Sequence, residues 1–194
     1  MVKVENLTRV YHTGSIQQVV FDALDFSVEK GETVAMLGAS GSGKTTLLNL
    51  VSGIDTPDNG RVLLDDVDVH ALAEPERTLF RRRRIGFVFQ FFNLIPTLTG
   101  EENITLPLRI AGREPDREWF DQVVDILGIR DRLTHRPTEM SGGQQQRVAV
   151  ARAIASRPKL VLADEPTGNL DRRTGDKVGQ LLFDLHEEAG ATLV

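Results

Sequence analysis

A glycine-rich segment, Gly38-Ala-Ser-Gly-Ser-Gly-Lys-Thr-Thr46, constrains the fold of this chain more than any other feature. It fits the pattern G-x-x-x-x-G-K-[ST], whose glycines let the backbone bend until several amide N–H groups point at one anion. The apolar run Thr33–Leu37 before it predicts a strand, and Lys44–Ser52 predicts a helix that ends at Gly53. A strand, a phosphate-binding loop and a helix in this order predict an α/β nucleotide-binding core.

The side chains of this loop suit a nucleoside triphosphate bound with a cation. Lys44 would reach the β- and γ-phosphates as a point charge, and the Thr45 hydroxyl would coordinate Mg²⁺. A chance glycine-rich turn is the alternative, but it explains neither the preceding strand nor the following helix. We therefore expect phosphate contacts from Gly38, Ser40, Gly41, Ser42, Gly43, Lys44, Thr45 and Thr46.

Apolar runs and turn residues predict the other elements. Strands are expected at Val2–Leu7, Val19–Val28, Arg61–Leu64, Arg84–Gln90 and Leu160–Ala163, and a further strand starts at Ala191–Val194. Helical patterns cover Glu101–Glu139 with interruptions at Pro107, Pro115 and Pro137, then Ser141–Ser156 and Thr174–Glu188. Helices that alternate with buried strands imply a mainly parallel α/β sheet.

Two carboxylates follow the apolar strand Leu160–Ala163, in the order Asp164-Glu165-Pro166. Ligands of open parallel sheets bind at the carboxyl ends of the strands, where this pair would lie. Asp164 is suited to hold Mg²⁺ directly or through water, because a hard cation prefers oxygen ligands. Glu165 would accept a proton from the attacking water as general base. An Asp-Glu pair on its own more often marks a solvated turn. In a chain that also has a phosphate-binding loop, the pair predicts a magnesium-binding and catalytic site.

The segment Met140-Ser-Gly-Gly-Gln-Gln-Gln-Arg147 supplies a second anion-binding signal. Ser141 is a good N-cap, and Gly142 and Gly143 leave the first amides of the helix uncovered. One ATP does not need two anion-binding sites, the glycine-rich loop and this helix N-terminus, on one subunit. A head-to-tail dimer, in which each signature covers the γ-phosphate held by the other subunit, is the economical solution.

These motifs, together with Gln90 at the end of a strand and Gly168-Asn-Leu-Asp171, resemble the nucleotide-binding subunits of ABC transporters over nearly the whole chain. The family's signature usually begins with Leu where this chain has Met140, a swap that conserves volume. The resemblance implies a P-loop NTPase core with a mainly parallel sheet, an N-terminal antiparallel β subdomain and an inserted helical subdomain. It places one ATP-binding domain at 1–194, with the core in 1–90 and 157–194 and the helical part in 91–156.

The resemblance also assigns roles, with ATP and Mg²⁺ as cofactors. Glu165, Gln90 and Lys44 are the implied catalytic residues, and Thr45, Gln90 and Asp164 the implied magnesium ligands. Contacts to nucleotide held by the opposite subunit are implied for Ser141, Gly142, Gly143, Gln144 and Asp171. Tyr11 occupies the place of an aromatic residue that stacks on adenine; a tyrosine packed at a strand end is the alternative.

Partners follow from the same resemblance: membrane-spanning permease subunits, and a second identical or closely related ATPase subunit. The apolar residues Phe91, Phe92, Leu94 and Ile95 suit a docking groove for a coupling helix, or pack beneath the helical part. The runs Phe89–Thr99 and Asp164–Asp171 look most like the lipoprotein-releasing, macrolide-export and cell-division branch.

Composition narrows the remaining alternatives. A net charge of −5 and the absence of cysteine argue against general nucleic-acid binding, a disulfide scaffold and a thiolate metal site. No run of about 18 apolar residues occurs, so the chain would serve a membrane process from outside the bilayer. The resemblance implies a peripheral place at the cytoplasmic face of the inner membrane. A GTPase or small-molecule kinase would share the phosphate loop but not the Ser-Gly-Gly-Gln signature. A soluble ABC-type ATPase acting on nucleic acid or the ribosome is the other rival, although residues 91–140 show no heptads.

Three further features predict structure rather than function. Arg81–Arg84 is expected to be a solvated helix end, although four arginines could also contact nucleic acid or acidic lipid. Trp119, Phe120 and Val124 have helical spacing and are expected in the core. The four histidines, His12, His70, His135 and His186, show no metal-ligand spacing.

The end of the sequence departs from the family's pattern. Ala191–Val194 reads as the start of a strand that, in the family, leads to a histidine contacting the γ-phosphate. No histidine follows this strand in the given sequence, since the last histidine, His186, precedes it. We therefore expect a truncated, partial or damaged chain that lacks the last part of the fold. It should retain ATP contacts, with impaired hydrolysis and lowered stability.

Overall fold

The computed structural model describes residues 1–168, 170–189 and 191–194, without the side chains of residues 174, 181 and 185–189. Asn169 of the predicted Gly168–Asp171 motif, Gly190 and the His186 side chain therefore lie outside the description. The strands are β1 (Val2–Thr13), β2 (Ile16–Val28), β3 (Asn59–Leu64), β4 (Val67–Asp68), β5 (Ile85–Val88), β6 (Leu160–Ala163) and β7 (Thr192–Leu193). The α-helices are α1 (Lys44–Ser52), α2 (Glu74–Arg84), α3 (Gly100–Ile110), α4 (Arg117–Leu127), α5 (Gly142–Ile154) and α6 (Arg172–Ala189), with 3₁₀ turns at Arg130–Arg132 and Pro137–Glu139.

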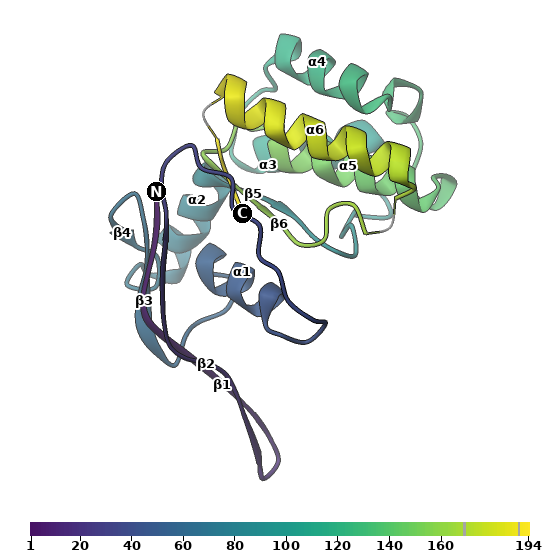
Figure 1. Ribbon diagram of the computed structural model, residues 1–194. Coiled ribbons are helices and arrows are strands. Elements are labelled where there is room, and N and C mark those ends of the chain that lie inside the picture. Colours follow the sequence, from purple (N-terminus) through teal and green to yellow (C-terminus); the bar gives the residue numbers. More distant parts are fainter. Residues whose placement is uncertain (169, 190) are drawn as a thin grey trace.

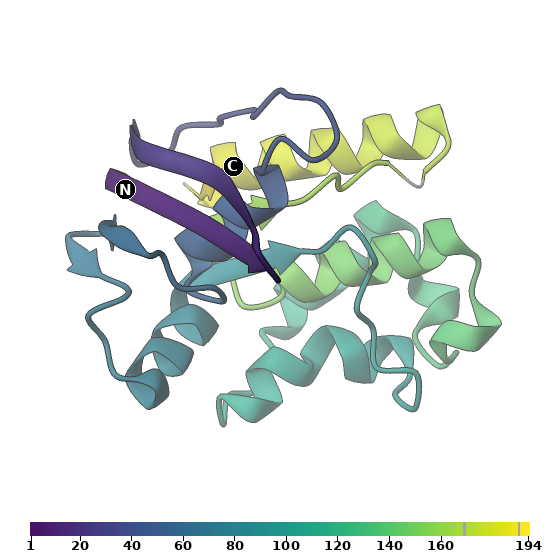
Figure 2. The same ribbon diagram turned by 90° about the horizontal axis from the view of Figure 1, so that it is seen from below.

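The N-terminal strands form an antiparallel sheet in the order β2-β1-β3-β4. β1 and β2 make a hairpin whose register runs from Val2↔Val28 to Thr13↔Ile16. Its far end projects away from the other elements in Figure 1, and Figure 2 views the molecule from below, the side toward which the hairpin projects. Both strands are longer than predicted, because residues 8–18 are largely polar and exposed and lack the clear alternation that marks a half-buried strand.

The second sheet is parallel, in the order β5-β6-β7, as the sequence predicts. Side chains of β6 alternate between two cores: Leu160 and Leu162 pack with the interior of α1 and the antiparallel sheet, whereas Val161 packs with the helices. Because β6 is buried on both faces, its carboxyl end is held firmly between the two halves of the molecule. Asp164 and Glu165 follow at that end.

The expected strand at Thr33–Leu37 is not formed. Only Thr33 makes an isolated bridge, to Leu193, and the Val34 amide donates to the Leu193 carbonyl at 2.9 Å. β7 covers only two residues, so the rest of the run has no described strand beside it to bond, and Leu37 is 95% exposed. An apolar run becomes a strand only where a neighbouring backbone completes its hydrogen bonds.

Helices α3, α4, α5 and α6 gather on one side of the parallel sheet (Figure 1). Trp119, Phe120 and Val124 lie in their core, as predicted, and the Trp119 indole N–H donates to the Ile154 carbonyl at 3.0 Å. α3 continues through Pro107 for three residues, so the interruption expected there is absent. Arg81–Arg84 form the last turn of α2, so the predicted helix end is confirmed. Only Arg83 is exposed as a solvated end would be, because Arg81 donates to the Gly53 carbonyl and Arg84 pairs with Asp65.

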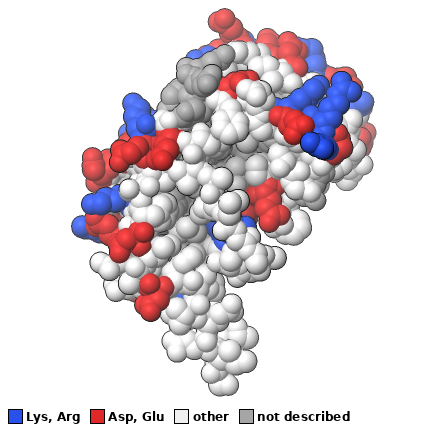
Figure 3. All heavy atoms as spheres, viewed as in Figure 1, with Lys and Arg blue, Asp and Glu red and all other residues white. Residues whose placement is uncertain are grey.

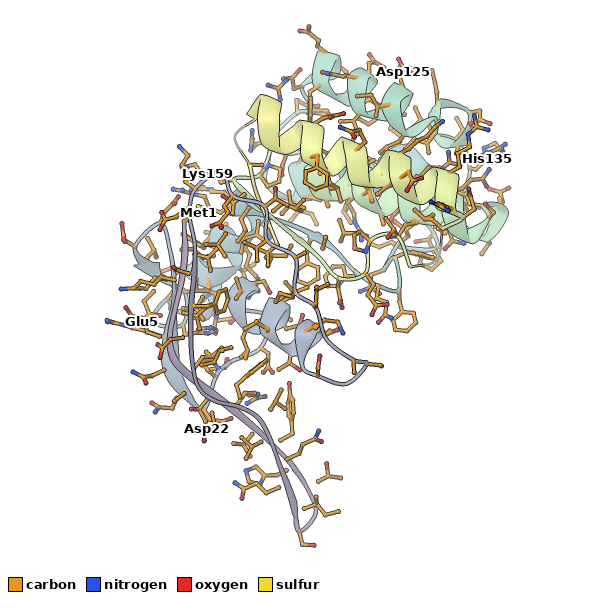
Figure 4. All side chains as sticks on the ribbon, viewed as in Figure 1. Met1, Glu5, Asp22, Asp125, His135 and Lys159 are labelled. Atoms are coloured by element: carbon orange, nitrogen blue, oxygen red, sulfur yellow. The ribbon has the colours of Figure 1, made fainter. Side chains whose placement is uncertain are left out.

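Side chains labelled in Figure 4 mark the two halves of the molecule. Met1, Glu5 and Asp22 lie along the antiparallel sheet, and Asp125 and His135 lie at the helical side. No helix within the described residues is long and apolar enough to cross a membrane.

Candidate nucleotide site

The glycine-rich loop adopts a conformation that other residues could not take without strain. Gly41 and Gly43 have φ angles of 80° and 96°, in the left-handed region. A Cβ at Gly43 would lie 2.7 Å from Val20 Cγ1, and one at Gly38 would lie 2.6 Å from the Ser42 hydroxyl. The loop leads directly into α1, whose N-cap Gly43 has no capping side chain and whose first turn carries no acid. The amides of this N-terminus are therefore free of a capping carboxylate or hydroxyl, as an anion site requires.

Lys44 bends back over the loop that precedes it. Its ammonium donates to the carbonyls of Gly38 at 2.9 Å and Ala39 at 3.0 Å. These bonds hold a positive charge at the mouth of the loop. Phosphate oxygens can replace the two carbonyls as acceptors, because charge-assisted bonds to phosphate are stronger than bonds to neutral carbonyls.

Oxygen-bearing side chains meet where the loop faces the end of β6. The Thr45 hydroxyl donates to Asp164 Oδ2 at 2.7 Å, and Asp164 is buried, with its backbone N–H bonded to the Val88 carbonyl at 2.9 Å. A hydroxyl and a carboxylate are ligands that Mg²⁺ accepts together with phosphates, so this donor set fits the cation. No cluster of three or more His, Cys, Asp or Glu occurs in the described part of the chain.

Two residues that the sequence assigned to the attacking water lie side by side. Gln90 follows β5, Glu165 follows β6, and Gln90 Nε2 donates to Glu165 Oε2 at 3.1 Å. Glu165 has a φ of 48°, unusual for a residue other than glycine, asparagine or aspartate. Its carbonyl accepts the Gly168 amide at 3.0 Å, which closes the turn that carries the pair.

Tyr11 lies on the hairpin with its ring held from two directions. Its hydroxyl donates to Asp55 at 2.9 Å, and the Arg9 guanidinium lies 4.6 Å over the ring centroid while pairing with the same Asp55. The side chain is 37% exposed, so it is not packed in the core. Its exposure leaves the ring accessible to a base, whereas its contacts to Arg9 and Asp55 fit a tyrosine packed at a strand end, so the stacking role stays a prediction.

One hollow of about 220 Å³ brings most of the predicted residues together. It is lined by Tyr11, Gln18, Val20, Ser40, Gly41, Gly43, Lys44, Thr45, Thr46, Gln90 and Glu165. Sequence analysis missed Gln18 and Val20. Gln18 lies opposite Tyr11 in the hairpin register, and Val20 follows on the same face, so a hairpin with Gly14 and Ser15 as its turn would have identified both.

The signature residues do not line this hollow. Ser141 is the N-cap of α5, as predicted: its hydroxyl accepts the Gln144 amide at 3.4 Å, and its amide donates to Gln144 Oε1 at 2.8 Å. Gly142, like Ser141, is exposed. Asp171 lines a separate hollow of about 380 Å³ between α4, α5 and α6. Within one chain, therefore, the two proposed anion-binding sites do not share a pocket.

The apolar residues after Gln90 divide into two groups. Phe91 is 79% exposed and Ile95 is also exposed, whereas Leu94 packs against the helical core and Phe92 is half-buried. The packing of Leu94 agrees with the second interpretation, whereas the docking groove stays a prediction for the exposed residues Phe91 and Ile95.

Comparison with known proteins identifies the class that this fold and site define. A family model described as "ABC transporter" matches residues 21–168. An uncharacterized ABC transporter ATP-binding protein of Mycobacterium tuberculosis is 50% identical over 196 residues, covering 100% of this chain and 79% of that protein. This chain belongs to the ABC transporter family, as an ATP-binding subunit.

Other relatives narrow the assignment. The lipoprotein-releasing system ATP-binding protein LolD of Geobacter metallireducens is 45% identical over 200 residues, covering 100% of this chain and 87% of LolD. A solved dimeric structure of the ATP-binding cassette MJ0796, in a post-hydrolysis state bound to ADP and Pi, has a TM-score of 0.94 at 42% identity; it matches 100% of this chain and 86% of that chain. Within the family, the chain falls in the branch of LolD and the macrolide export protein MacB.

Proposed function

We propose that this chain binds and hydrolyses ATP with Mg²⁺ as one half of a dimer, and that hydrolysis drives membrane-spanning permease partners from the cytoplasmic face of the membrane. The observation that carries the chemistry is the Gln90–Glu165 contact beside the Thr45–Asp164 bond, at the carboxyl ends of the neighbouring strands β5 and β6. This is the edge at which open parallel sheets bind ligands.

The chain's residues divide the work of phosphoryl transfer. The loop amides and Lys44 hold the phosphates, and Tyr11 stacks on the base. Thr45, Asp164 and Gln90 would hold Mg²⁺, which neutralises charge on the phosphate oxygens. Glu165 accepts a proton from water while the water oxygen bonds to the γ-phosphorus and the bond from that phosphorus to the β-phosphate oxygen breaks.

Two observations support the dimer. The signature at Ser141–Gln144 lies outside the hollow that Lys44 and Thr45 line, so a second copy would have to supply it. The related cassette MJ0796 is described as a dimer, bound in one structure to ADP and Pi. On the face drawn in Figure 3, the projecting end of the hairpin shows no charged side chains.

Phosphate release from ATP tests the proposal. We expect Mg²⁺-dependent release by the unaltered protein and a fall of about 10²–10⁴-fold in Glu165→Gln, because general-base catalysis contributes about that much. Asp121→Asn is the matched control, since Asp121 is an exposed carboxylate on α4 paired with Arg130. Equal release by Glu165→Gln and Asp121→Asn would contradict the role of Glu165. Co-purification with nucleic acid rather than membrane protein would favour the rival function.

A further inference from the structure

Helix α5 is in backbone contact with strand β5. A Cβ added at Gly86 of β5 would clash with the Ala153 carbonyl of α5. At such close approach α5 and β5 cannot shift much relative to each other, because packed interiors deform little. The helix that begins at the signature is thus fixed to the strand that ends before Gln90.

Arg152 of α5 reaches the backbone just after Gln90. Its Nη1 donates to the Asn93 carbonyl at 2.5 Å and its Nη2 to the Phe92 carbonyl at 2.7 Å. Phe92 and Asn93 both have left-handed φ angles, of 52° and 49°. Burial lowers the pKa of the Arg152 guanidinium, whose two bonds both go to backbone carbonyls rather than to a carboxylate. A half-buried arginine that donates to two carbonyls of a strained turn fixes that turn.

Gln146, on the same helix, reaches the backbone just after Glu165. Its side chain is fully buried, and Nε2 donates to the Pro166 carbonyl at 2.6 Å. Pro166 directly follows Glu165, whose own φ of 48° is left-handed. Each half of the Gln90–Glu165 pair is therefore followed, within three residues, by a carbonyl that α5 holds.

We propose that Arg152 and Gln146 are positioning residues, through which α5 sets the 3.1 Å contact between Gln90 and Glu165. The assignment rests on the proposed function, because that function makes Gln90 and Glu165 catalytic. A fork-shaped guanidinium can bridge two carbonyls at once, whereas a lysine ammonium on a flexible stem cannot hold both in fixed geometry. Arg152→Lys thus removes the clamp and keeps the charge.

The kinetic test uses Arg152→Lys, Gln146→Leu and the control Arg117→Ala, whose guanidinium is at the surface near Glu101. We expect kcat to fall about tenfold to a hundredfold in the first two, with KM for ATP unchanged, because misplacing catalytic groups by about 1 Å costs that much. In a Gln90→Ala background, Arg152→Lys should cause no further loss. A full additional loss there, or a raised KM with unchanged kcat, would overturn the proposal.

A second measurement does not depend on hydrolysis. The chain has no cysteine, so Phe91→Cys offers a single thiol for a spin label on an exposed position beside the clamp. We expect Arg152→Lys to increase label mobility at position 91, and Arg117→Ala to leave it unchanged. Equal mobility in folded Arg152→Lys would refute the positioning role. Increased mobility in a protein that does not hydrolyse ATP would retain the clamp and reject the proposed function instead.

Discussion

Gln90 Nε2 donates to Glu165 Oε2 at 3.1 Å, although 75 positions separate the two residues in the chain. Parallel pairing of β5 with β6 creates this contact, because Val88 pairs with Ala163 and the two strands end together. The Thr45–Asp164 bond lies at the same edge. The positions that we propose for the cation, the water and the phosphates thus converge at one end of a short buried sheet.

Lys44→Ala should weaken ATP binding. The ammonium at the mouth of the loop makes charge-assisted bonds, whose loss costs about 1.5–3 kcal/mol, or about 10- to 150-fold in Kd. Isothermal titration calorimetry with ATP measures it. Lys3→Ala is the control, because Lys3 is exposed and pairs with Glu5 in the antiparallel sheet. An unchanged Kd for Lys44→Ala would remove Lys44 from the site.

Tyr11→Ala and Tyr11→Phe separate stacking from anchoring. The alanine variant loses the ring and should bind ATP about 2- to 10-fold more weakly, in line with about 0.5–1.5 kcal/mol for aromatic stacking. The phenylalanine variant loses only the bond to Asp55 and should bind nearly as the unaltered protein does. Fluorescence titration with a nucleotide analogue carrying a labelled ribose would show the difference. Equal affinity of all three proteins would favour a structural tyrosine.

Thr45→Val should raise the Mg²⁺ concentration needed for half-maximal phosphate release. Valine keeps the shape of threonine but removes the hydroxyl that bonds Asp164 at 2.7 Å and supplies one oxygen ligand. Thr46→Val, one residue later on the same helix, is the comparison variant. If both variants show the magnesium requirement of the unaltered protein, Thr45 is not a ligand.

His70 predicts a pH dependence of stability. Burial lowers its pKa below the ordinary value, outweighing the bond from the ring to the Leu50 carbonyl, and the nearby Arg77 lowers it further. Below pH about 6.5 the unfolded chain takes up a proton that folded His70 resists, so stability should fall as pH decreases through that range. Melting temperatures between pH 8 and 5 measure this. His70→Gln should flatten the fall; an equally steep curve would assign it to other groups.

The local motifs were predictable because each carries its own chemistry. Gly43 needs a left-handed backbone, Ser141 caps a helix, and Asp164 follows an apolar strand, and every one of these signals lies within a few residues. The parallel direction of the sheet followed from the alternation of strands and helices, whereas the pairing of Ile85–Val88 with Leu160–Ala163 is seen only in the structure.

Long-range relations were not predictable from local pattern. Thr33–Leu37 is as apolar as a strand, but its conformation depends on how many residues pair beside it, and β7 offers two. Gln18 enters the nucleotide hollow only because the hairpin register sets it opposite Tyr11. Arg152 and Gln146 read as ordinary polar positions of a helix, and their carbonyl partners lie 59, 60 and 20 residues away.

The oligomeric state of Glu165→Gln, measured by light scattering with and without ATP, tests the central claim most directly. Slow hydrolysis should leave ATP in place, and we expect a monomer without nucleotide and a dimer with it, in which Ser141 of one copy faces Lys44 of the other. A monomer under both conditions, with ATP bound as shown by calorimetry, would contradict the account, because the signature would then not close on a partner's nucleotide.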